Sequence, residues 1–368
     1  MTSVDLELDV GERRLRFPAV WLRDNCPCAE CVAPGTGQKL RDITELPNGL
    51  GVSGTELTPD SVVVTFAPDQ HRSVFSRAWL AAHALDRHGG DAGRTEDHKQ
   101  LWIPATLAAR PETSWHRFTG AGKAAALEAV LRLGFVLVHD VPAEPGTVLE
   151  VAAGFGFVRE TNYGRLFDVR VEPAPGNLAF TSRAISPHTD NPYRDPVPTV
   201  QLLHCLRTAA EGGDTGLVDG FAAAAAFRAA DPEGFGVIAS TPIPFGYLDH
   251  GAELRACLPL IQLSPRGRVA GVRYNNRSAQ ALQAPYAEVT AFYDACRRWA
   301  ALLAEPARQL NLRLAPGDCL IFDNTRILHA RTAFTMSAGS PGRHLQGCYA
   351  DLDGLASTLA VLRTAEGS

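Results

Sequence analysis

The sequence lacks any run of about 18 apolar residues, so it predicts no transmembrane helix. Residues 1–5 are mostly polar or acidic and lack the apolar core of a secretory signal peptide. The formal net charge is −5, which argues against non-specific binding to nucleic acid. We therefore expect a cytoplasmic protein with neither a membrane nor a nucleic acid among its partners.

The composition is typical of a soluble globular protein. Hydrophobic residues make up 45% of the 368 residues and charged residues 20%, which is enough to bury a sizeable core. This length suits one large or two ordinary domains. Because prolines and a glycine interrupt residues 101–120, this stretch is typical of a connector, and we expect a domain boundary near residue 105. The two predicted domains are residues 1–105 and residues 106–368.

Three of the eight cysteines, Cys26, Cys28 and Cys31, lie close together in the sequence. In a reducing compartment this spacing predicts a metal site that lacks one ligand, rather than disulfides. His71 is our candidate because it follows a predicted strand, and a closed Cys3His site would hold a structural zinc ion. The other histidines that could complete the site are His83, His88 and His98. Inert thiols in a loop and a thiol-based redox sensor are the alternatives.

A second metal-binding pattern lies further along the chain. His188 and Asp190 are two positions apart in an extended segment, so their side chains point to the same side. His329 is a good candidate for a third ligand. Two histidines and one carboxylate, with three coordination positions left open, are typical of non-haem Fe(II) oxygenases. A His-x-Asp pair is common by chance, so this hypothesis depends on the surrounding sequence.

The second domain contains many strands separated by long connections. Strands are expected at residues 135–138, 199–203, 217–218, 269–274 and 319–322, and helices at residues 123–133, 221–230 and 287–304. This pattern predicts a mainly β (α+β) fold, in which a double-stranded β-helix, or jelly roll, carries covering helices. The short alternating runs near the N-terminus predict a small α+β zinc-binding domain.

Several longer segments make chance a poor explanation for the two metal patterns. They are residues 21–28 (Trp-Leu-Arg-Asp-Asn-Cys-Pro-Cys), 68–71, 188–190, 200–205, 212–215, 322–324 and 343–351. Through these segments, which extend over nearly the whole chain, the sequence resembles the γ-butyrobetaine and trimethyllysine hydroxylase branch of the taurine-dioxygenase-like Fe(II)/2-oxoglutarate oxygenases.

The resemblance implies a role for each matching residue. The implied zinc ligands are Cys26, Cys28, Cys31 and His71, and the implied iron ligands are His188, Asp190 and His329. Arg343 would bind the distal carboxylate of 2-oxoglutarate, because a planar guanidinium meets two carboxylate oxygens at once. Arg331 is a rival, but it lies only two residues after His329. Thr215 matches a position that contacts the cosubstrate, with a hydroxyl satisfied by the backbone as an equal alternative.

The implied reaction consumes O2 and 2-oxoglutarate, releases succinate and CO2, and hydroxylates an unactivated C–H bond of a small molecule. Ascorbate is expected to assist. Related enzymes pair as homodimers, so a homodimer is expected here as well. Two rival hypotheses remain: a natural-product or amino-acid hydroxylase on the same scaffold, and a zinc-dependent interaction protein with a vestigial iron site.

The resemblance also points to a substrate that carries a trimethylammonium group. The matching positions of an aromatic cage are Tyr163, Phe167, Phe180 and Tyr349. Ring faces attract a cation, although core packing is the usual role of any single aromatic residue. Asp168, next to the cage in sequence, could neutralise the cation directly.

The other end of such a substrate is expected to be anionic. The candidate residues are Asn177, Asn191, Asn276 and Arg277. Asn191 and the segment around Asn276 depart from the butyrobetaine hydroxylases and resemble the relative that acts on 2-(trimethylamino)ethylphosphonate. An Arg charge with amides suits a three-oxygen phosphonate better than a carboxylate, unless Arg277 forms an ordinary surface ion pair. Both 2-(trimethylamino)ethylphosphonate and γ-butyrobetaine remain candidate substrates.

Overall fold

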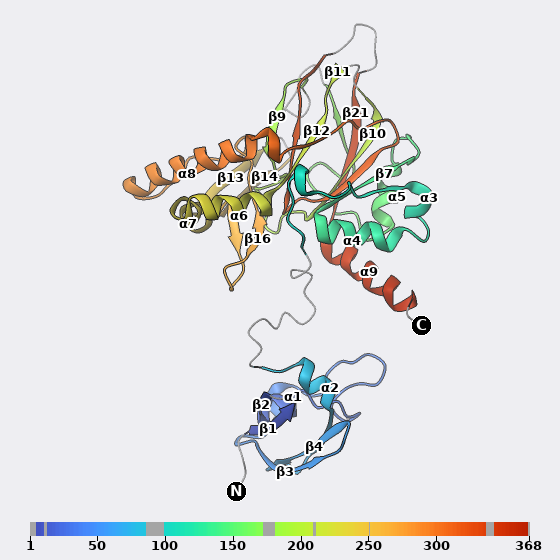
Figure 1. The fold of residues 1–368 in the computed structure, drawn as a ribbon, viewed down its shortest axis with the longest axis vertical. Helices are drawn as coiled ribbons and strands as arrows, with labels where there is room; N and C mark the ends of the chain where they lie inside the picture. Colours follow the sequence, from blue (N-terminus) through green and yellow to red (C-terminus); the bar gives the residue numbers. More distant parts are fainter. Residues whose placement is uncertain are drawn as a thin grey trace. The chain divides into compact units, whose positions relative to one another are not determined.

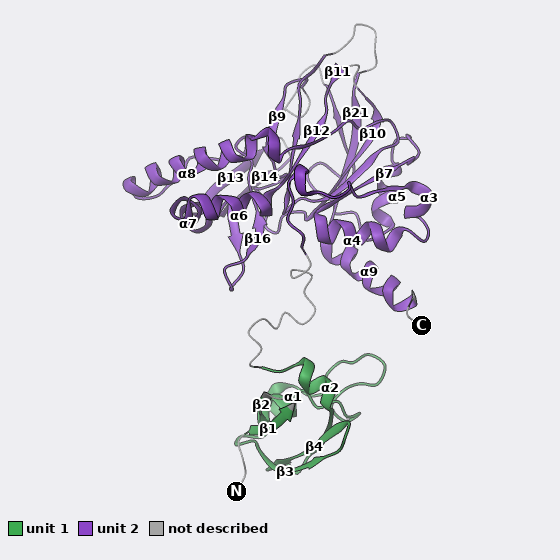
Figure 2. Ribbon diagram, viewed as in Figure 1, with its two compact units in different colours: residues 1–97 green, residues 98–368 purple. Residues whose placement is uncertain are grey.

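The computed structural model describes residues 5–10, 13–85, 99–171, 181–208, 211–249, 251–335 and 342–366 (Figure 1). The chain divides into two compact units, residues 1–97 and residues 98–368 (Figure 2). No helix within the described ranges is long and apolar enough to cross a membrane.

The smaller unit is built from short strands, most of which bury every second side chain. Its elements are β1 (Asp5–Val10), β2 (Arg13–Pro18), α1 (Ala19–Asp24), β3 (Gly51–Leu57), β4 (Ser61–Ala67), β5 (Arg72–Ser76) and α2 (Arg77–Ala82). β1 pairs with β2, and β3, β4 and β5 form an antiparallel sheet. In β4 every second residue is buried, so Val62, Val64 and Phe66 line the core of this unit.

The two largest sheets of the larger unit have six and four strands, and three two-stranded sheets accompany them among the described residues. The six-stranded sheet has the order β6 (Glu112–Ser114), β7 (Phe135–His139), β18 (Cys319–Asp323), β10 (Val200–Arg207), β21 (His344–Ala350) and β8 (Phe167–Arg170). The four-stranded sheet has the order β17 (Leu310–Leu312), β12 (Thr215–Asp219), β19 (Ile327–Arg331) and β9 (Ile185–His188). Apolar side chains of both sheets form one buried cluster, so the sheets pack face to face.

Helices cover the outer side of this two-layered core. α4 (Lys123–Leu133), α5 (Thr147–Ala153) and α9 (Leu352–Glu366) lie on one side of the unit (Figure 1). They share a second buried cluster with the outward-facing residues of the six-stranded sheet. α6 (Gly220–Ala230), α7 (Pro232–Ser240) and α8 (Tyr286–Ala304) form a third.

The remaining short strands are β11 (Glu211–Gly212), β13 (Ile243–Leu248), β14 (Glu253–Leu258), β15 (Ile261–Leu263), β16 (Val269–Val272) and β20 (Phe334–Thr335), and α3 spans Trp115–Phe118. The unit is therefore a mixed α/β structure with many strands.

Helix α4 shows how the local sequence determines the bounds of a predicted helix. It has the predicted bounds, and it ends at Gly134, whose φ of +90° is the left-handed conformation that glycine adopts without strain. A Cβ atom at this position would lie 2.7 Å from the side chain of Ile327. Gly134 therefore permits both the end of the helix and its close approach to β19.

A buried ion pair fixes the start of the larger unit. The side chains of Arg326 and Asp219 are both fully buried, and their closest atoms are 2.8 Å apart. Asp219 also accepts a hydrogen bond from the backbone N–H of Trp102, and Arg326 donates to the carbonyl of Gln100. Residues 99–102, which precede the boundary expected near residue 105, are thereby held against the larger unit.

Candidate active site

The three residues proposed as iron ligands meet between the two sheets of the larger unit. His188 ends β9 and lies opposite His329 in the ladder with β19. Asp190 follows just beyond β9, and its Oδ1 is 3.4 Å from His188 Nε2 and 4.0 Å from His329 Nε2. One ligand atom from each residue lies within 4.8 Å of the others, so a single ion can contact all three.

Neighbouring groups direct the ligand atoms toward this common point. His188 Nδ1 lies 2.9 Å from the carbonyl of Ser186, so Nδ1–H donates and Nε2 keeps its lone pair for a metal. The other carboxylate oxygen of Asp190, Oδ2, accepts hydrogen bonds from Gln201 Nε2 at 2.8 Å and from the Tyr349 hydroxyl at 3.0 Å. Oδ1 is therefore the oxygen left to bind an ion.

The backbone of Asp190 is fixed by one amide side chain. Its N–H donates to Asn324 Oδ1 at 2.8 Å, and Asn324 Nδ2 donates to its carbonyl at 3.0 Å. Asn324 is fully buried and also donates to the carbonyl of Pro198. This clamp explains how a ligand that lies outside any strand keeps a defined position.

The protonation states suit a divalent metal. Burial, together with the proximity of His188, lowers the pKa of His329 to about 3, which favours its neutral imidazole. Burial opposes the charged form of Asp190, but His329 and His188 outweigh it and hold the pKa of this carboxyl below its usual range. Neutral imidazoles, one carboxylate and open positions are the donor set that Fe(II) oxygenases use, so the residues fit the ion.

A cavity of about 450 Å³ opens at these ligands, and both proposed cosubstrate residues line it. Thr215 and Arg343 are buried, and burial lowers the pKa of the Arg343 guanidinium. Arg331 also lines the cavity, but it donates to the carbonyls of Thr181 at 2.6 Å and Arg183 at 2.8 Å. Part of Arg331 is thus engaged in holding the backbone, which leaves Arg343 better placed for a ligand carboxylate.

Aromatic rings form one wall of the same cavity. Tyr163, Phe167 and Tyr349 line it, with ring centroids 6.2 Å apart for the first pair and 5.0 Å for the second. Two further tyrosines, which the sequence reasoning missed, extend this wall: Tyr247 lies 5.6 Å from Tyr163 and 5.0 Å from Tyr193. The only feature of the sequence that could have pointed to either tyrosine is the position of Tyr193, three residues after Asp190.

Three other residues predicted to bind the substrate are not among the described residues that line the cavity. Asn177 and Phe180 lie outside the described residues. Asp168 does not line the cavity, because it alternates with Phe167 along β8 and faces the other side of the sheet. There it contacts His344 Nε2 at 2.6 Å and accepts a hydrogen bond from Gln346 at 3.0 Å. Asp168 therefore cannot neutralise a cation in the cavity as predicted.

Polar groups gather on another part of the cavity wall. Asn191 and Arg277, two of the candidates for the anionic end of the substrate, both line it. Asn276 is exposed and does not line it; the neighbouring Asn275, which precedes the turn at residues 276–278, takes that place. Asn275 Oδ1 accepts hydrogen bonds from the backbone N–H and Nε of Arg277, and its Nδ2 donates to the carbonyl of Thr189. Asn275 thus holds Arg277 beside the metal-binding segment.

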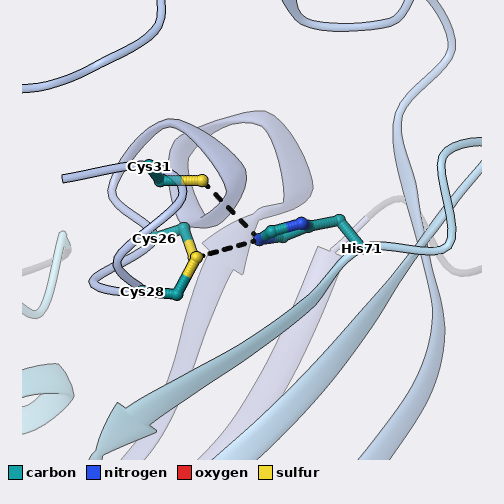
Figure 3. Close-up of side chains that lie close together, drawn as sticks. All are labelled: Cys26, Cys28, Cys31 and His71. Carbon is teal, nitrogen blue, oxygen red and sulfur yellow. Dashed lines mark hydrogen bonds between the residues drawn. The ribbon is translucent and has the colours of Figure 1, made fainter.

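The cysteine cluster of the smaller unit also converges. His71 Nε2 is 3.2 Å from Cys26 Sγ and 3.7 Å from the sulfurs of both Cys28 and Cys31 (Figure 3). A tetrahedral zinc site gives nitrogen–sulfur separations of about 3.6 Å. The buried guanidinium of Arg23 donates to Cys31 Sγ at 3.3 Å, which would offset the negative charge of three thiolates. The four residues therefore fit a closed metal site.

The chain is similar to two described families. Residues 103–349 match "Taurine catabolism dioxygenase TauD, TfdA family", and residues 3–81 match "Gamma-butyrobetaine hydroxylase-like, N-terminal".

Three curated relatives illustrate the similarity. The gamma-butyrobetaine dioxygenase of Pseudomonas sp. (strain AK-1) is 34% identical over 351 residues, which cover 94% of this chain and 90% of the relative. The gamma-butyrobetaine dioxygenase of Homo sapiens is 29% identical over 366 residues, covering 96% and 92%. The trimethyllysine dioxygenase of Meyerozyma guilliermondii is 29% identical over 384 residues, covering 98% and 93%.

Proposed function

Because the chain belongs to the taurine catabolism dioxygenase TauD, TfdA family, it is an Fe(II)- and 2-oxoglutarate-dependent dioxygenase, and we propose that it hydroxylates a small trimethylammonium-bearing acid. One observation carries the proposal: a single cavity brings the metal-binding triad together with an aromatic wall and a second, cationic wall. The names of the relatives, gamma-butyrobetaine and trimethyllysine dioxygenases, point to the same substrate class.

The triad would bind the metal, and Arg343 would bind the cosubstrate. Fe(II) bound by His188, Asp190 and His329 would supply the oxidation of an unactivated C–H bond by O2, coupled to the conversion of 2-oxoglutarate to succinate and CO2. Arg343 would bind the distal carboxylate through two parallel N–H groups, with the Thr215 hydroxyl beside it. The backbone at Gly213 leaves room for this arginine, since a Cβ there would lie 3.0 Å from Arg343 Cδ.

The aromatic wall would bind the cationic end of the substrate. Each ring face that contacts a desolvated cation contributes about 0.5–2 kcal/mol. Three rings, those of Tyr163, Phe167 and Tyr247, can act together because they border one space. Asp190 is the only carboxylate among the described lining residues, so rings rather than a salt bridge would select a quaternary ammonium group here.

Arg277, which lines the cavity with Asn191, would bind the anionic end of the substrate. The described residues that line the cavity include three guanidinium groups, those of Arg277, Arg331 and Arg343, and one carboxylate, that of Asp190. The charges of Fe(II) and 2-oxoglutarate cancel one another. The net positive charge of the lining side chains therefore remains to attract the substrate. This surplus, with the amide of Asn191, favours the dianionic group of 2-(trimethylamino)ethylphosphonate over the single carboxylate of γ-butyrobetaine.

A cosubstrate-consumption screen tests the proposal. Purified protein with Fe(II) and 2-oxoglutarate is given γ-butyrobetaine, trimethyllysine or 2-(trimethylamino)ethylphosphonate, and succinate and hydroxylated product are quantified. The matched control for each compound replaces the ammonium nitrogen by carbon, which keeps the shape and removes the charge. We expect the control to lose at least about 30-fold in kcat/KM, equivalent to roughly 2 kcal/mol of cation–π energy. Equal turnover of the uncharged controls, or no hydroxylation of any of the three acids, would refute the proposal.

We also propose that Cys26, Cys28, Cys31 and His71 hold a structural zinc ion. The nitrogen–sulfur separations, the burial of two of the thiols and the charge of Arg23 support this assignment. Such a site has no open position for a substrate, so its role would be to stabilise the smaller unit.

A further inference from the structure

We propose that Arg273 is a positioning residue for hydroxylation: its buried guanidinium fixes residues 191–194, and with them the place of the substrate relative to the metal-binding triad. Arg273 itself is not among the described residues that line the cavity. The inference rests on the proposed function in one respect, because it takes the substrate to be a trimethylammonium acid bound in this cavity.

Two hydrogen bonds join Arg273 to the backbone of a distant segment. Arg273 directly follows β16 and is 4% exposed. Its Nη1 donates to the carbonyls of Pro192 and Arg194, each at 2.6 Å. A guanidinium can only donate and a carbonyl can only accept, so the direction of both bonds is fixed. Arg273 thereby holds the two carbonyls on either side of Tyr193.

The segment that Arg273 holds supplies part of the cavity wall. Asn191 and Tyr193 line the cavity, and the ring of Tyr193 stacks on that of Tyr247 at 5.0 Å. Residues 189–199 lie outside any helix or strand, so no ladder of a sheet fixes this part of the chain. Its position therefore depends on side-chain contacts such as those from Arg273.

The residues after Arg273 hold the chain on the other side of Asp190. The Thr189 N–H donates to the carbonyl of Tyr274 at 2.8 Å, and Asn275 Nδ2 donates to the Thr189 carbonyl at 3.3 Å. These contacts do not involve the Arg273 side chain. Loss of the guanidinium is therefore expected to move the cavity wall while Asp190 stays in place.

Packing alone is a poor explanation for a charged residue at this position. The ion pair of Arg273 with Asp195 is long, 3.8 Å between Nη2 and Oδ1, and the Asp195 side chain is 66% exposed. Arg273 Nε is buried and has no hydrogen-bond partner among the described residues. Burial accordingly lowers the pKa of the guanidinium. An apolar side chain of similar volume would fill the space at a lower cost in free energy, so what the arginine adds is the fixed position of two carbonyls.

Misplacement of the substrate has a measurable chemical consequence. In coupled turnover, one 2-oxoglutarate, one O2 and one substrate molecule give one succinate, one CO2 and one hydroxylated product. When the C–H bond lies out of reach, the oxygen atom that would enter the product is instead reduced to water, with two electrons and two protons from a reductant such as ascorbate. Succinate then forms without product, so the ratio of product to succinate reports the position of the substrate.

The ratio of hydroxylated product to succinate in Arg273→Met tests the inference. Both are quantified in one reaction with a turned-over trimethylammonium acid, 2-oxoglutarate, Fe(II) and ascorbate. We expect the ratio to fall at least about threefold, since a shift of about 1 Å can reduce a rate by much more than this. Fe(II) affinity and the KM for 2-oxoglutarate should change less than about twofold, because the contacts of Asp190 and Arg343 are untouched. The ratio does not depend on how much of the enzyme is folded, so a loss of stability alone leaves it unchanged.

Two further variants complete the test. Arg273→Lys keeps the charge and one donor nitrogen, so we expect a ratio between those of the wild type and Arg273→Met, and this variant decides the question if Arg273→Met does not fold. Arg159→Met is the matched control. Arg159 donates to the carbonyls of Pro196 at 2.6 Å and Val197 at 3.0 Å, further along the same connection, and none of these three is among the described residues that line the cavity. It should keep the wild-type ratio.

Three results would overturn the inference and leave the proposed function intact. They are an unchanged ratio in Arg273→Met, or in Arg273→Lys where the first variant does not fold; an equal fall of the ratio in Arg159→Met; and a loss of about tenfold or more in Fe(II) affinity, which would mean that Arg273 acts through the metal ligands. If the wild-type enzyme hydroxylates none of the trimethylammonium acids, the proposed function fails first, and the inference falls with it.

Discussion

Tyr349 contributes to two parts of the site at once, and replacing it by phenylalanine separates them. Its hydroxyl donates to Asp190 Oδ2 at 3.0 Å, and its ring packs 5.0 Å from Phe167 in the aromatic wall. Tyr349→Phe removes the first contact and keeps the second. We therefore expect weaker binding of Fe(II) with little change in the binding of a trimethylammonium group.

The size of the effect follows from the hydrogen bond that is lost. A hydrogen bond to a charged group contributes about 1.5–3 kcal/mol. Loss of a partner that orients a metal ligand typically lowers metal affinity by roughly 10–100-fold. Gln201 remains as a second donor to Asp190 Oδ2, so the lower end, about tenfold, is the expected value for the single variant. The double variant Tyr349→Phe with Gln201→Met leaves Oδ2 without either donor and should approach the upper end.

Anaerobic competition with a coloured chelator measures Fe(II) affinity directly, without turnover. Succinate production titrated with Fe(II), and then with substrate at saturating Fe(II), separates the metal from the substrate contribution. The reasoning is refuted if Tyr349→Phe binds Fe(II) as tightly as the wild type while the KM for the substrate rises. That result would mean that the hydroxyl serves the substrate rather than Asp190.

Three further variants test other parts of the structure. Asp219→Ala leaves the fully buried guanidinium of Arg326 unpaired, so we expect a loss of roughly 3–5 kcal/mol in the free energy of unfolding by denaturant titration, and a smaller loss for Asp219→Asn. Gly347→Ala places a Cβ 2.4 Å from the ring of Phe167 and 3.0 Å from a neighbouring carbonyl, so the ring must shift; KM for a trimethylammonium acid should rise at least about threefold, with the KM for 2-oxoglutarate unchanged. Cys28→Ser should lower zinc content and speed hydrogen exchange in residues 1–97 while residues 98–368 keep their protection, and normal zinc content would contradict the site.

Motifs with a strong local signal were the part of this protein that the sequence could predict. The family resemblance is confirmed, and so are the many strands and the covering helices of the larger unit. Helix α4 has the predicted bounds because its apolar spacing and Gly134 define both its face and its end. His329 could be named as a candidate partner of the His-x-Asp pair, and the resemblance supported it, but nothing local in the sequence states that β9 and β19 are neighbours.

The residues that sequence reasoning missed act through contacts between distant segments. Gln201 reaches Asp190 because β10 and β21 bring it beside Tyr349, where the two donors share one carboxylate oxygen. Tyr247 joins the aromatic wall from a hairpin whose sequence carries no distinctive motif. Their roles depend on strand register, which a single sequence does not specify for pairs this far apart.

The misplaced residues, by contrast, had a local explanation. Asp168 was assigned to the substrate because it follows Phe167 in sequence, yet neighbours in a strand point to opposite faces. If β8 is recognised as a strand, Asp168 is expected on the opposite face of the sheet from Phe167, which is where it contacts His344. No such rule was available to choose between Asn275 and Asn276, because a turn follows and side chains in a turn have no fixed period. Adjacency in sequence therefore identifies a neighbourhood of the site, and the periodicity of the local element decides which of two neighbours enters the cavity.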